Sequence, residues 1–285
     1  MINITELPFY GHKAEFLGLV DRHQVVVVAV PTGGGKSTLS PLFLLEAGYG
    51  NRGMIGVTQP RRIAAMSVCE WVAHLHGSDV GRTIGYQIRQ DRALSDTTRV
   101  KFMTEGILLR ELHGDPSLKR YSVVVVDEAH ERGVNQDLIL GLLKRLLPKR
   151  PDLKVVVMSA TIDEERFATF FDGAPILRVQ GRLFPVEVNY ANDTPYNLSK
   201  MVTACAEKIV ELVRKSHGDI LAFMPDERSI KQVCEQVEKA VGRAVRVLPL
   251  YGAQAPWEQK QVFEMNGGRL VIVATNIAET SLTIE

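Results

Sequence analysis

The 285-residue chain has few of the features that mark secreted, membrane-bound or zinc-stabilised proteins. Its three cysteines, Cys69, Cys205 and Cys234, are odd in number and lack zinc-type spacing, which argues against a disulfide framework or a zinc site. No apolar run approaches the roughly 20 residues of a membrane span. The first ten residues lack the basic-then-apolar order of a signal peptide. We therefore expect a soluble, cytoplasmic protein without a membrane partner.

Strong charge and aromatic enrichment are also lacking. The formal net charge is only +1 and aromatic residues make up 7% of the chain, so composition alone does not indicate a nucleic-acid binder. Any basic surface must be local. Because no aromatic pattern suited to stacking bases is present, nucleic-acid affinity should depend on backbone charge and fall with salt.

Short apolar segments alternate with helical stretches such as 39–47, and this alternation predicts an α/β fold with parallel sheets. The predicted strands are 24–30, 54–58, 100–103, 122–126, 155–158, 176–179, 220–224, 245–248 and 270–274. With about 150 residues per domain, the length predicts two domains. A polar, turn-rich stretch places them at residues 1–188 and 197–285, joined by a linker at 189–196.

A glycine-rich segment, Pro31–Thr38, follows the first predicted strand. Three successive glycines can adopt positive φ and point backbone N–H groups at an anion, and the next helix adds its positive N-terminal end. Lys36 is placed to reach the β- and γ-phosphates of a nucleotide, and the Ser37 hydroxyl to ligate magnesium. The residues expected to bind the nucleotide are Thr32, Gly33, Gly34, Gly35, Lys36, Ser37 and Thr38. The full pattern starts with glycine where this chain has Val30, and an ordinary glycine turn into a helix is the alternative.

Two adjacent acids, Asp127 and Glu128, follow the apolar run Val123–Val126, and His130 comes two residues later. Carboxylates at the end of a buried strand cost several kcal/mol unless a cation lies beside them. The pair therefore predicts a magnesium-bound nucleotide, with the glycine-rich segment as the other half of its site.

Seven segments occur in one order along the chain: the glycine-rich segment, Thr58–Ala65, Thr104–Arg110, Asp127–Arg132, Ser159–Thr161, Leu221–Pro225 and Ala274–Ile284. Together they resemble the motifs of the DEAH-box branch of the superfamily 2 helicases, and the resemblance covers nearly the whole chain. It implies two RecA-like P-loop domains with parallel sheets, of which the second is truncated.

The resemblance also implies catalytic roles. Lys36 would neutralise phosphate charge, Ser37 and Asp127 would hold Mg²⁺, and Glu128 would be the base that activates water. His130 would link the nucleotide site to neighbouring motifs; the alternative is a surface histidine at a helix start. The residues expected to couple NTP hydrolysis to movement along the nucleic acid are Ser159, Thr161 and Ser281.

Nucleic-acid contacts are implied at Arg61, Arg62 and Thr104 in the first domain and at Thr275 in the second. Arginines and hydroxyls suit phosphate oxygens, so we expect sequence-independent binding of a single strand, RNA in preference to DNA. Arg61 could instead pair with an acid of its own domain, because arginine binds carboxylates as readily as phosphates.

The function expected from the resemblance is an ATP-dependent RNA helicase that hydrolyses NTP to move along single-stranded nucleic acid. Nucleotide binding would close the two domains and hydrolysis would reopen them. The family's arginine-rich final motif does not occur before Glu285. We therefore expect low or no activity from this chain alone, and a catalytically silent nucleotide- and RNA-binding module is the alternative. A kinase or a transporter ATPase would leave Thr58–Ala65 and Ala274–Ile284 without a role.

Overall fold

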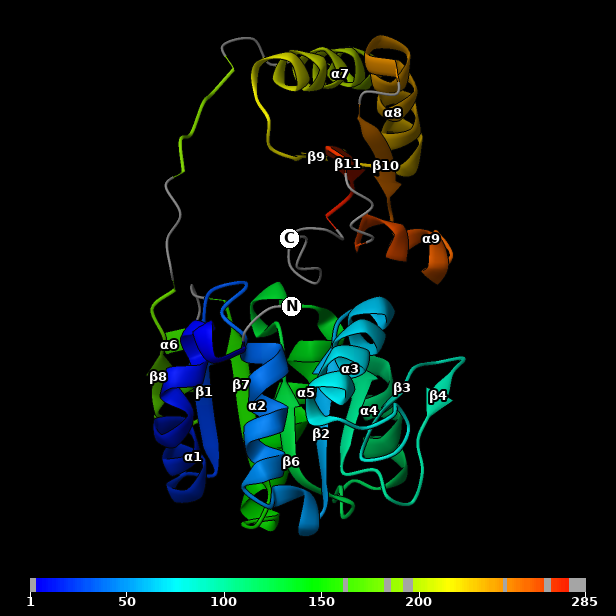
Figure 1. The fold of residues 1–285 in the computed structure, drawn as a ribbon. Helices are drawn as coiled ribbons and strands as arrows, with labels where there is room; N and C mark the ends of the chain where they lie inside the picture. Colours follow the sequence, from blue (N-terminus) through cyan, green and yellow to red (C-terminus); the bar gives the residue numbers. More distant parts are fainter. Residues whose placement is uncertain are drawn as a thin grey trace. The chain divides into compact units, whose positions relative to one another are not determined.

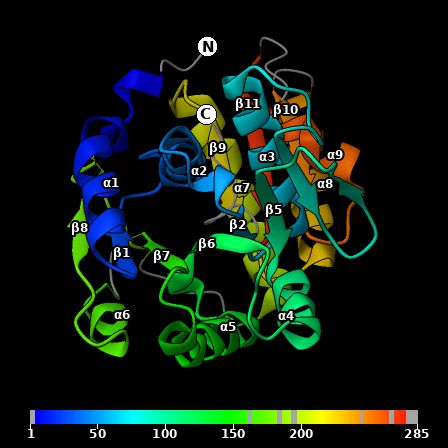
Figure 2. The ribbon, with the colours of Figure 1, turned by 90° about the horizontal axis from the view of Figure 1, so that it is seen from below.

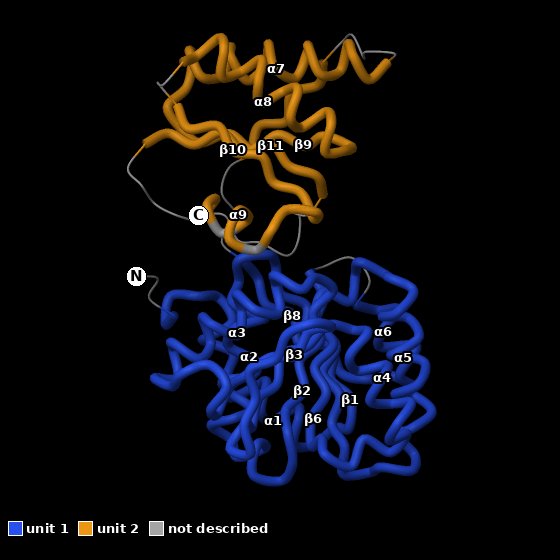
Figure 3. Tube along the Cα trace, turned by 90° about the vertical axis from the view of Figure 1, so that its right-hand side faces the viewer, with its two compact units in different colours: residues 1–183 blue, residues 184–285 orange. Residues whose placement is uncertain are grey.

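The computed structural model describes residues 4–160, 164–181, 186–191, 197–242, 245–263 and 268–276. Contacts between Cα atoms divide the chain into two compact units, residues 1–183 and 184–285 (Figure 3). The first unit contains the glycine-rich segment and the Asp127–Glu128 pair, and the second contains Thr275.

The first unit is built on an eight-stranded sheet with the order β4-β3-β5-β2-β6-β7-β1-β8. Its strands are β1 Val25–Ala29, β2 Met54–Gln59, β3 Ile84–Gln87, β4 Arg92–Ala93, β5 Val100–Thr104, β6 Tyr121–Val126, β7 Lys154–Ser159 and β8 Ile176–Arg178. Every neighbouring pair is parallel except β3 and β4. The carboxyl ends of these parallel strands therefore share one edge of the sheet, where ligand-binding loops are expected.

Helices cover both faces of this sheet. The α-helices are α1 Lys13–Arg22, α2 Lys36–Glu46, α3 Arg62–His76, α4 Glu105–Gly114, α5 Val134–Leu146 and α6 Glu164–Phe170. Shorter 3-10 helices are η1 Ile4–Glu6, η2 Pro8–His12, η3 Tyr49–Asn51, η4 Ala129–Glu131 and η5 Leu147–Lys149. Figure 2 shows α1, α2 and α3 on one face of the sheet and α4, α5 and α6 on the other.

The valine-rich strands explain this two-faced arrangement. Side chains alternate along a strand, so Val26 and Val28 of β1 join the core under α1–α3, while Val25 and Val27 join the core under α4–α6. All five residues of β1 are buried. A strand that is covered on both faces needs a continuous apolar run rather than an alternating one.

The α/β fold predicted from the sequence is confirmed, and each of the nine predicted strands is present. The short strands β3 and β4 were not predicted, because one contains Gly85 and the other has only two residues. The prediction of a helix starting at Leu39 was wrong at that end, since α2 begins at Lys36. Gly35, with φ of 90°, ends the loop and lets the helix start directly behind the glycines.

The second unit has a smaller parallel sheet with the order β10-β11-β9. Its elements are α7 Leu198–Lys215, β9 Ile220–Phe223, α8 Glu227–Val241, β10 Arg246–Leu250, α9 Pro256–Lys260, η7 Gln261–Phe263 and β11 Leu270–Ala274. Figure 1 shows α7 and α8 together beside this sheet. Val202 and Ile209 of α7 pack with Val233 of α8 and Val273 of β11 in one apolar core.

Among the helices of the described ranges, none is long and apolar enough to cross a membrane.

A cluster of buried polar side chains connects β5 and β6 to α4. Its contacts lead to a prediction about stability. Lys101 of β5 is 2% exposed, and its Nζ lies 2.5 Å from Glu111 Oε1 of α4. The Tyr121 hydroxyl donates to the other oxygen of Glu111. We expect Glu111→Ala to lower the free energy of unfolding by about 2 to 3 kcal/mol, because the buried Lys101 loses its carboxylate partner and the Tyr121 hydroxyl keeps only the weak acceptor Met103 Sδ.

Urea denaturation followed by circular dichroism measures this loss. Arg110→Ala, at the exposed neighbouring position, should change stability by no more than about 0.5 kcal/mol. Equal stability of Glu111→Ala and the unmodified chain would show that the Glu111 contacts do not stabilise the unit.

Candidate nucleotide-binding site

The glycine-rich loop between β1 and α2 has the backbone geometry of a phosphate cradle. Gly33 and Gly35 have φ of 76° and 90°, a region that favours glycine. A Cβ atom built on Gly34 would lie 2.4 Å from Val30 Cγ1, so this position also requires glycine. The loop leads into the N-terminus of an 11-residue helix, where backbone N–H groups and the helix dipole favour an anion.

The N-terminal segment supports this loop from outside. The Phe9 backbone N–H donates to the Gly34 carbonyl at 3.1 Å. A Cβ atom on Gly35 would lie 3.0 Å from Leu7 Cδ1. The Phe9 ring is fully buried against Phe16 and Phe43, so η2 holds the loop through both backbone and apolar contacts.

Lys36 and Glu128 form a buried ion pair at the carboxyl edge of the sheet. Lys36 Nζ lies 2.8 Å from Glu128 Oε1, and each side chain is only 5% exposed. Glu128 follows β6 by two positions and has a left-handed backbone, with φ of 52°. Such a conformation is costly for a residue other than glycine, and strained residues of this kind cluster at functional sites. The turn therefore directs the Glu128 carboxylate toward the phosphate loop.

The two charges shift each other's protonation. Burial and the neighbouring Asp127 raise the pKa of Glu128 to about 7, although Lys36 opposes the rise. Burial alone would lower the pKa of Lys36, but Asp127 and Glu128 outweigh it and raise that pKa. Burial and the adjacent Asp127 thus make proton uptake by Glu128 easier than at an exposed glutamate, while Lys36 keeps its positive charge.

Asp127 is completely buried and held by two donors. Gln59 Nε2 donates to Asp127 Oδ2 at 2.6 Å, and the Glu128 backbone N–H donates to Oδ1 at 2.8 Å. Gln136 Nε2 donates to the backbone carbonyls of both acids at 3.0 and 3.2 Å. These contacts fix the orientation of the carboxylate and still leave lone pairs on both of its oxygens.

His130 connects the acid pair to the end of β7. The Ala160 backbone N–H donates to His130 Nδ1 at 3.1 Å, so a neutral ring carries its proton on Nε2. His130 Nε2 lies 3.3 Å from Glu128 Oε2. Within the described residues, no donor reaches that buried oxygen with hydrogen-bond geometry. His130 therefore bridges the segment of Ser159 and the acid pair.

The remaining predicted positions differ in their surroundings. Ser159 ends β7, and its buried hydroxyl has no hydrogen-bond partner among the described residues. Thr104 is the N-cap residue of α4, and Thr32 is exposed. Thr275 follows β11 in the second unit, and its backbone N–H donates to the Leu250 carbonyl at 3.1 Å. The other two coupling residues, Thr161 and Ser281, lie outside the described residues.

Arg61 and Arg62 lie where β2 leads into α3. Arg62 is the first residue of α3 and is exposed. Arg61 Nη2 lies 3.8 Å from Glu131 Oε1, and both side chains are about one-fifth exposed, at 21% and 22%. The alternative for Arg61 was an ion pair with an acid of its own domain, and Glu131 is such an acid.

Four polar residues of this region were not assigned a role from the sequence: Gln59, Glu105, Glu131 and Gln136. Gln59 ends β2, the strand next to β6, so its position at a strand end could have indicated its contact with Asp127. Gln136 contacts Asp127 from the first turn of α5, which only the path of the chain brings close. Glu105 is 9% exposed, and burial together with the Glu131 charge raises its pKa to about 7.

The raised pKa of Glu105 predicts a pH-dependent stability. Between its ordinary pKa of 4.5 and about 7, the folded chain holds a proton on Glu105 that the unfolded chain has lost. Stability must therefore fall as pH rises through this window. We expect Glu105→Gln to remove this contribution to the fall. The stability of the variant relative to the unmodified chain should therefore be about 2 to 3 kcal/mol higher at pH 8 than at pH 5.

Urea unfolding at pH 5, 6, 7 and 8 measures this difference. Glu46→Gln, the same substitution at a side chain that is 53% exposed, is the control. If the Glu105→Gln profile keeps the slope of the unmodified chain, Glu105 does not titrate in this window.

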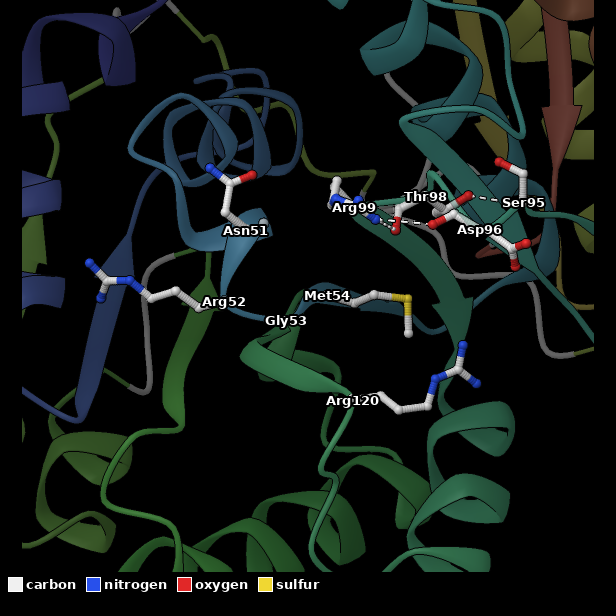
Figure 4. A pocket seen from close by; sticks show the side chains of 10 residues that line it. Asn51, Arg52, Gly53, Met54, Ser95, Asp96, Thr98, Arg99 and Arg120 are labelled. Carbon is white, nitrogen blue, oxygen red and sulfur yellow. Dashed lines mark hydrogen bonds between the residues drawn. The ribbon is translucent and has the colours of Figure 1, made fainter.

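A cleft of about 520 Å³ lies elsewhere in the first unit (Figure 4). It is bordered by Met54, the first residue of β2, and by Arg99, which precedes β5. It therefore lies at the opposite sheet edge from the phosphate loop. The Arg52 and Arg120 side chains extend away from each other (Figure 4).

Comparison with known proteins agrees with this geometry. Residues 12–169 match the family described as DEAD/DEAH box helicase. The chain is 45% identical to the ATP-dependent RNA helicase HrpA of Escherichia coli over 98% of its own length and 22% of that protein's. It is 41% identical to HrpA of Borreliella burgdorferi over 100% of its own length and 35% of that protein's.

A solved structure shares the fold as well. The crystal structure of the Escherichia coli DEAH/RHA helicase HrpB superposes with a TM-score of 0.88 at 38% identity. The match covers 98% of this chain and 36% of that one. The chain thus spans between about a fifth and a third of the length of these relatives. With its sequence match, its parallel sheet and its phosphate loop in agreement, this chain belongs to the DEAD/DEAH box helicase family.

Proposed function

We propose that this chain is the part of an ATP-dependent RNA helicase that binds ATP, hydrolyses it and grips single-stranded RNA. The observation that carries the proposal is the buried Lys36–Glu128 pair at the carboxyl edge of a parallel sheet, next to a glycine loop. The HrpA relatives are named ATP-dependent RNA helicases, which supports the choice of ATP and RNA.

In this proposal the phosphates of ATP lie in the loop of Gly33, Gly34 and Gly35. Thr32 and Thr38 border that loop, and Lys36 exchanges the Glu128 carboxylate for the β- and γ-phosphates. The exchange is favourable because phosphate oxygens offer the ammonium a second anion without leaving it buried and unpaired. It also frees Glu128 from its cation.

The residues present suit Mg²⁺. Ser37 and Asp127 would hold it, because a hydroxyl and a carboxylate are the oxygen ligands that this hard cation prefers. The Asp127 carboxylate is already oriented by Gln59, and Glu128 Oε2 is buried without a hydrogen-bond partner among the described residues. When bound, Mg²⁺ supplies neutralisation of charge on the phosphate oxygens.

Glu128, released from Lys36, then orients the attacking water and accepts its proton. His130 positions Glu128. It also connects Glu128 to the end of β7 at Ser159, because its ring accepts a hydrogen bond from the Ala160 backbone N–H. Thr161 and Ser281 are proposed to join this coupling.

RNA is proposed to bind through its phosphates. Arg61, Arg62 and Thr104 provide the contacts of the first unit, and Thr275 provides that of the second. Such contacts read the backbone and not the bases, so binding should be independent of sequence. Repeated cycles of ATP binding and hydrolysis would alternate the two grips and move the chain along one strand.

Phosphate release from ATP, measured with and without single-stranded RNA, tests the proposal. Hydrolysis that rises with RNA and requires Mg²⁺ is expected. Magnesium-dependent ATP binding without turnover would support the alternative of a nucleotide- and RNA-binding module, and the absence of ATP binding would overturn both.

A further inference from the structure

Glu131 contacts both Arg61, a proposed RNA-binding residue, and the backbone of Glu128, the proposed base. It ends the short helix η4, whose N-cap residue is Glu128. The Glu131 backbone N–H donates to the Glu128 carbonyl at 3.0 Å, so one turn of chain fixes the spacing of the two acids. The Glu131 carboxylate reaches Arg61 at 3.8 Å, across from the end of β2.

The Glu131 carboxylate lies close enough to two other carboxylates, those of Glu105 and Glu128, to act on them through its charge. Its charge raises the pKa of Glu105 and, to a smaller extent, that of Glu128. Glu105 also lies near the same turn, because a Cβ atom on Gly133 would be 3.9 Å from Glu105 Oε2. Arg61 faces the Glu131 carboxylate from the end of the neighbouring strand β2.

A phosphate and a carboxylate bind a guanidinium through the same donors. An RNA phosphate that reaches Arg61 would therefore meet an arginine already engaged by Glu131, and the two anions would repel each other at close range. The 3.8 Å separation and partial exposure make the existing pair weak enough for a phosphate to displace it.

We propose that Glu131 competes with RNA phosphate for Arg61, and that RNA binding releases Glu131 and reports to Glu128 through the η4 turn. The inference rests on the proposed function, in which Arg61 contacts RNA. It assigns to Glu131 a regulatory role, that of an internal phosphate mimic which lowers RNA affinity until a strand is bound. Glu131 is a positioning residue in this scheme and does not touch the reacting atoms.

A double-mutant cycle on RNA binding tests the competition. The four chains are the unmodified protein, Glu131→Gln, Arg61→Ala and the double variant, each titrated with a fluorescent single-stranded oligouridine without nucleotide. Glu131→Gln should tighten binding by about three- to tenfold, because it removes an anion that competes with phosphate for Arg61. In the Arg61→Ala background the same change should alter the dissociation constant by less than about twofold.

A matched control separates competition from general charge. Asp137→Asn removes a carboxylate that pairs with Arg132 on the exposed start of α5, with the same change in net charge. It should alter RNA affinity by less than about twofold. Thermal unfolding of each variant verifies folding, and Glu131→Gln keeps the side-chain shape.

Two outcomes would overturn the inference. One is an unchanged RNA affinity in Glu131→Gln, and the other is an equal gain with and without Arg61, which would mean a long-range charge effect. Failure of the proposed function looks different. In that case Arg61→Ala would bind RNA as tightly as the unmodified chain, and the slope of log affinity against log salt concentration would be unchanged. Loss of a real phosphate contact would instead reduce the magnitude of that slope by about one.

Discussion

Glu128→Gln should reduce RNA-stimulated ATP hydrolysis by about 10² to 10⁴ while ATP binding is retained. The amide keeps the shape of the side chain at the left-handed turn but cannot accept a proton from water. It also removes the anion that pairs with Lys36 in the nucleotide-free chain. ATP should therefore bind at least as tightly as to the unmodified protein.

Two measurements check this prediction. Phosphate release at saturating ATP and RNA gives the rate, and titration with a fluorescent ATP analogue gives the affinity. Glu46→Gln, the same substitution at an exposed site on α2, should match the unmodified chain in both. A rate for Glu128→Gln within about threefold of the unmodified chain would rule out Glu128 as the base.

Lys36→Met should weaken ATP binding by about a hundredfold, because the phosphates lose their charged partner while the apolar stem remains. The substitution has a second consequence in the nucleotide-free chain. Glu128 would be left buried beside Asp127 without a cation, and its pKa should rise above about 7. The stability of Lys36→Met should therefore fall as pH rises from 6 to 8, because over this range the folded chain holds a proton on Glu128 that the unfolded chain has already lost.

The double variant Lys36→Met with Glu128→Gln separates these effects. It removes both charges of the buried pair, so stability at pH 8 should recover while ATP binding stays weak. Isothermal titration and urea unfolding at both pH values provide the data. Recovery of ATP binding in the double variant would show that Lys36 acts only by neutralising Glu128 and not by contacting phosphate.

The chain sequence alone determined the local elements of this site. Valine runs specify strands that are buried on both faces, and each of the nine predicted strands forms. The three glycines before Lys36 specify a loop with positive φ at Gly33 and Gly35. These features depend on neighbouring residues, so period and backbone preference are sufficient to predict them.

Only the tertiary structure decided which distant side chains meet. Lys36 and Glu128 are far apart in sequence, and they come together because β1, β7 and β6 are neighbours in the sheet with their carboxyl ends at one edge. Family resemblance placed both residues in one site, but the buried ion pair between them depends on strand order. Strand order cannot be read from the pattern of any single strand.

The same reason explains why Glu131 was not assigned from the sequence. An exposed-looking acid after His130 has no local signal, and its position beside Arg61 results from β2 and β6 being adjacent in the sheet. The backbone pattern thus determined nine of the strands and the phosphate loop, but not the short strands β3 and β4 or the start of α2. The order of the parallel strands decided which charges face each other, because charges interact through space and their energy depends on separation and burial rather than on position along the chain.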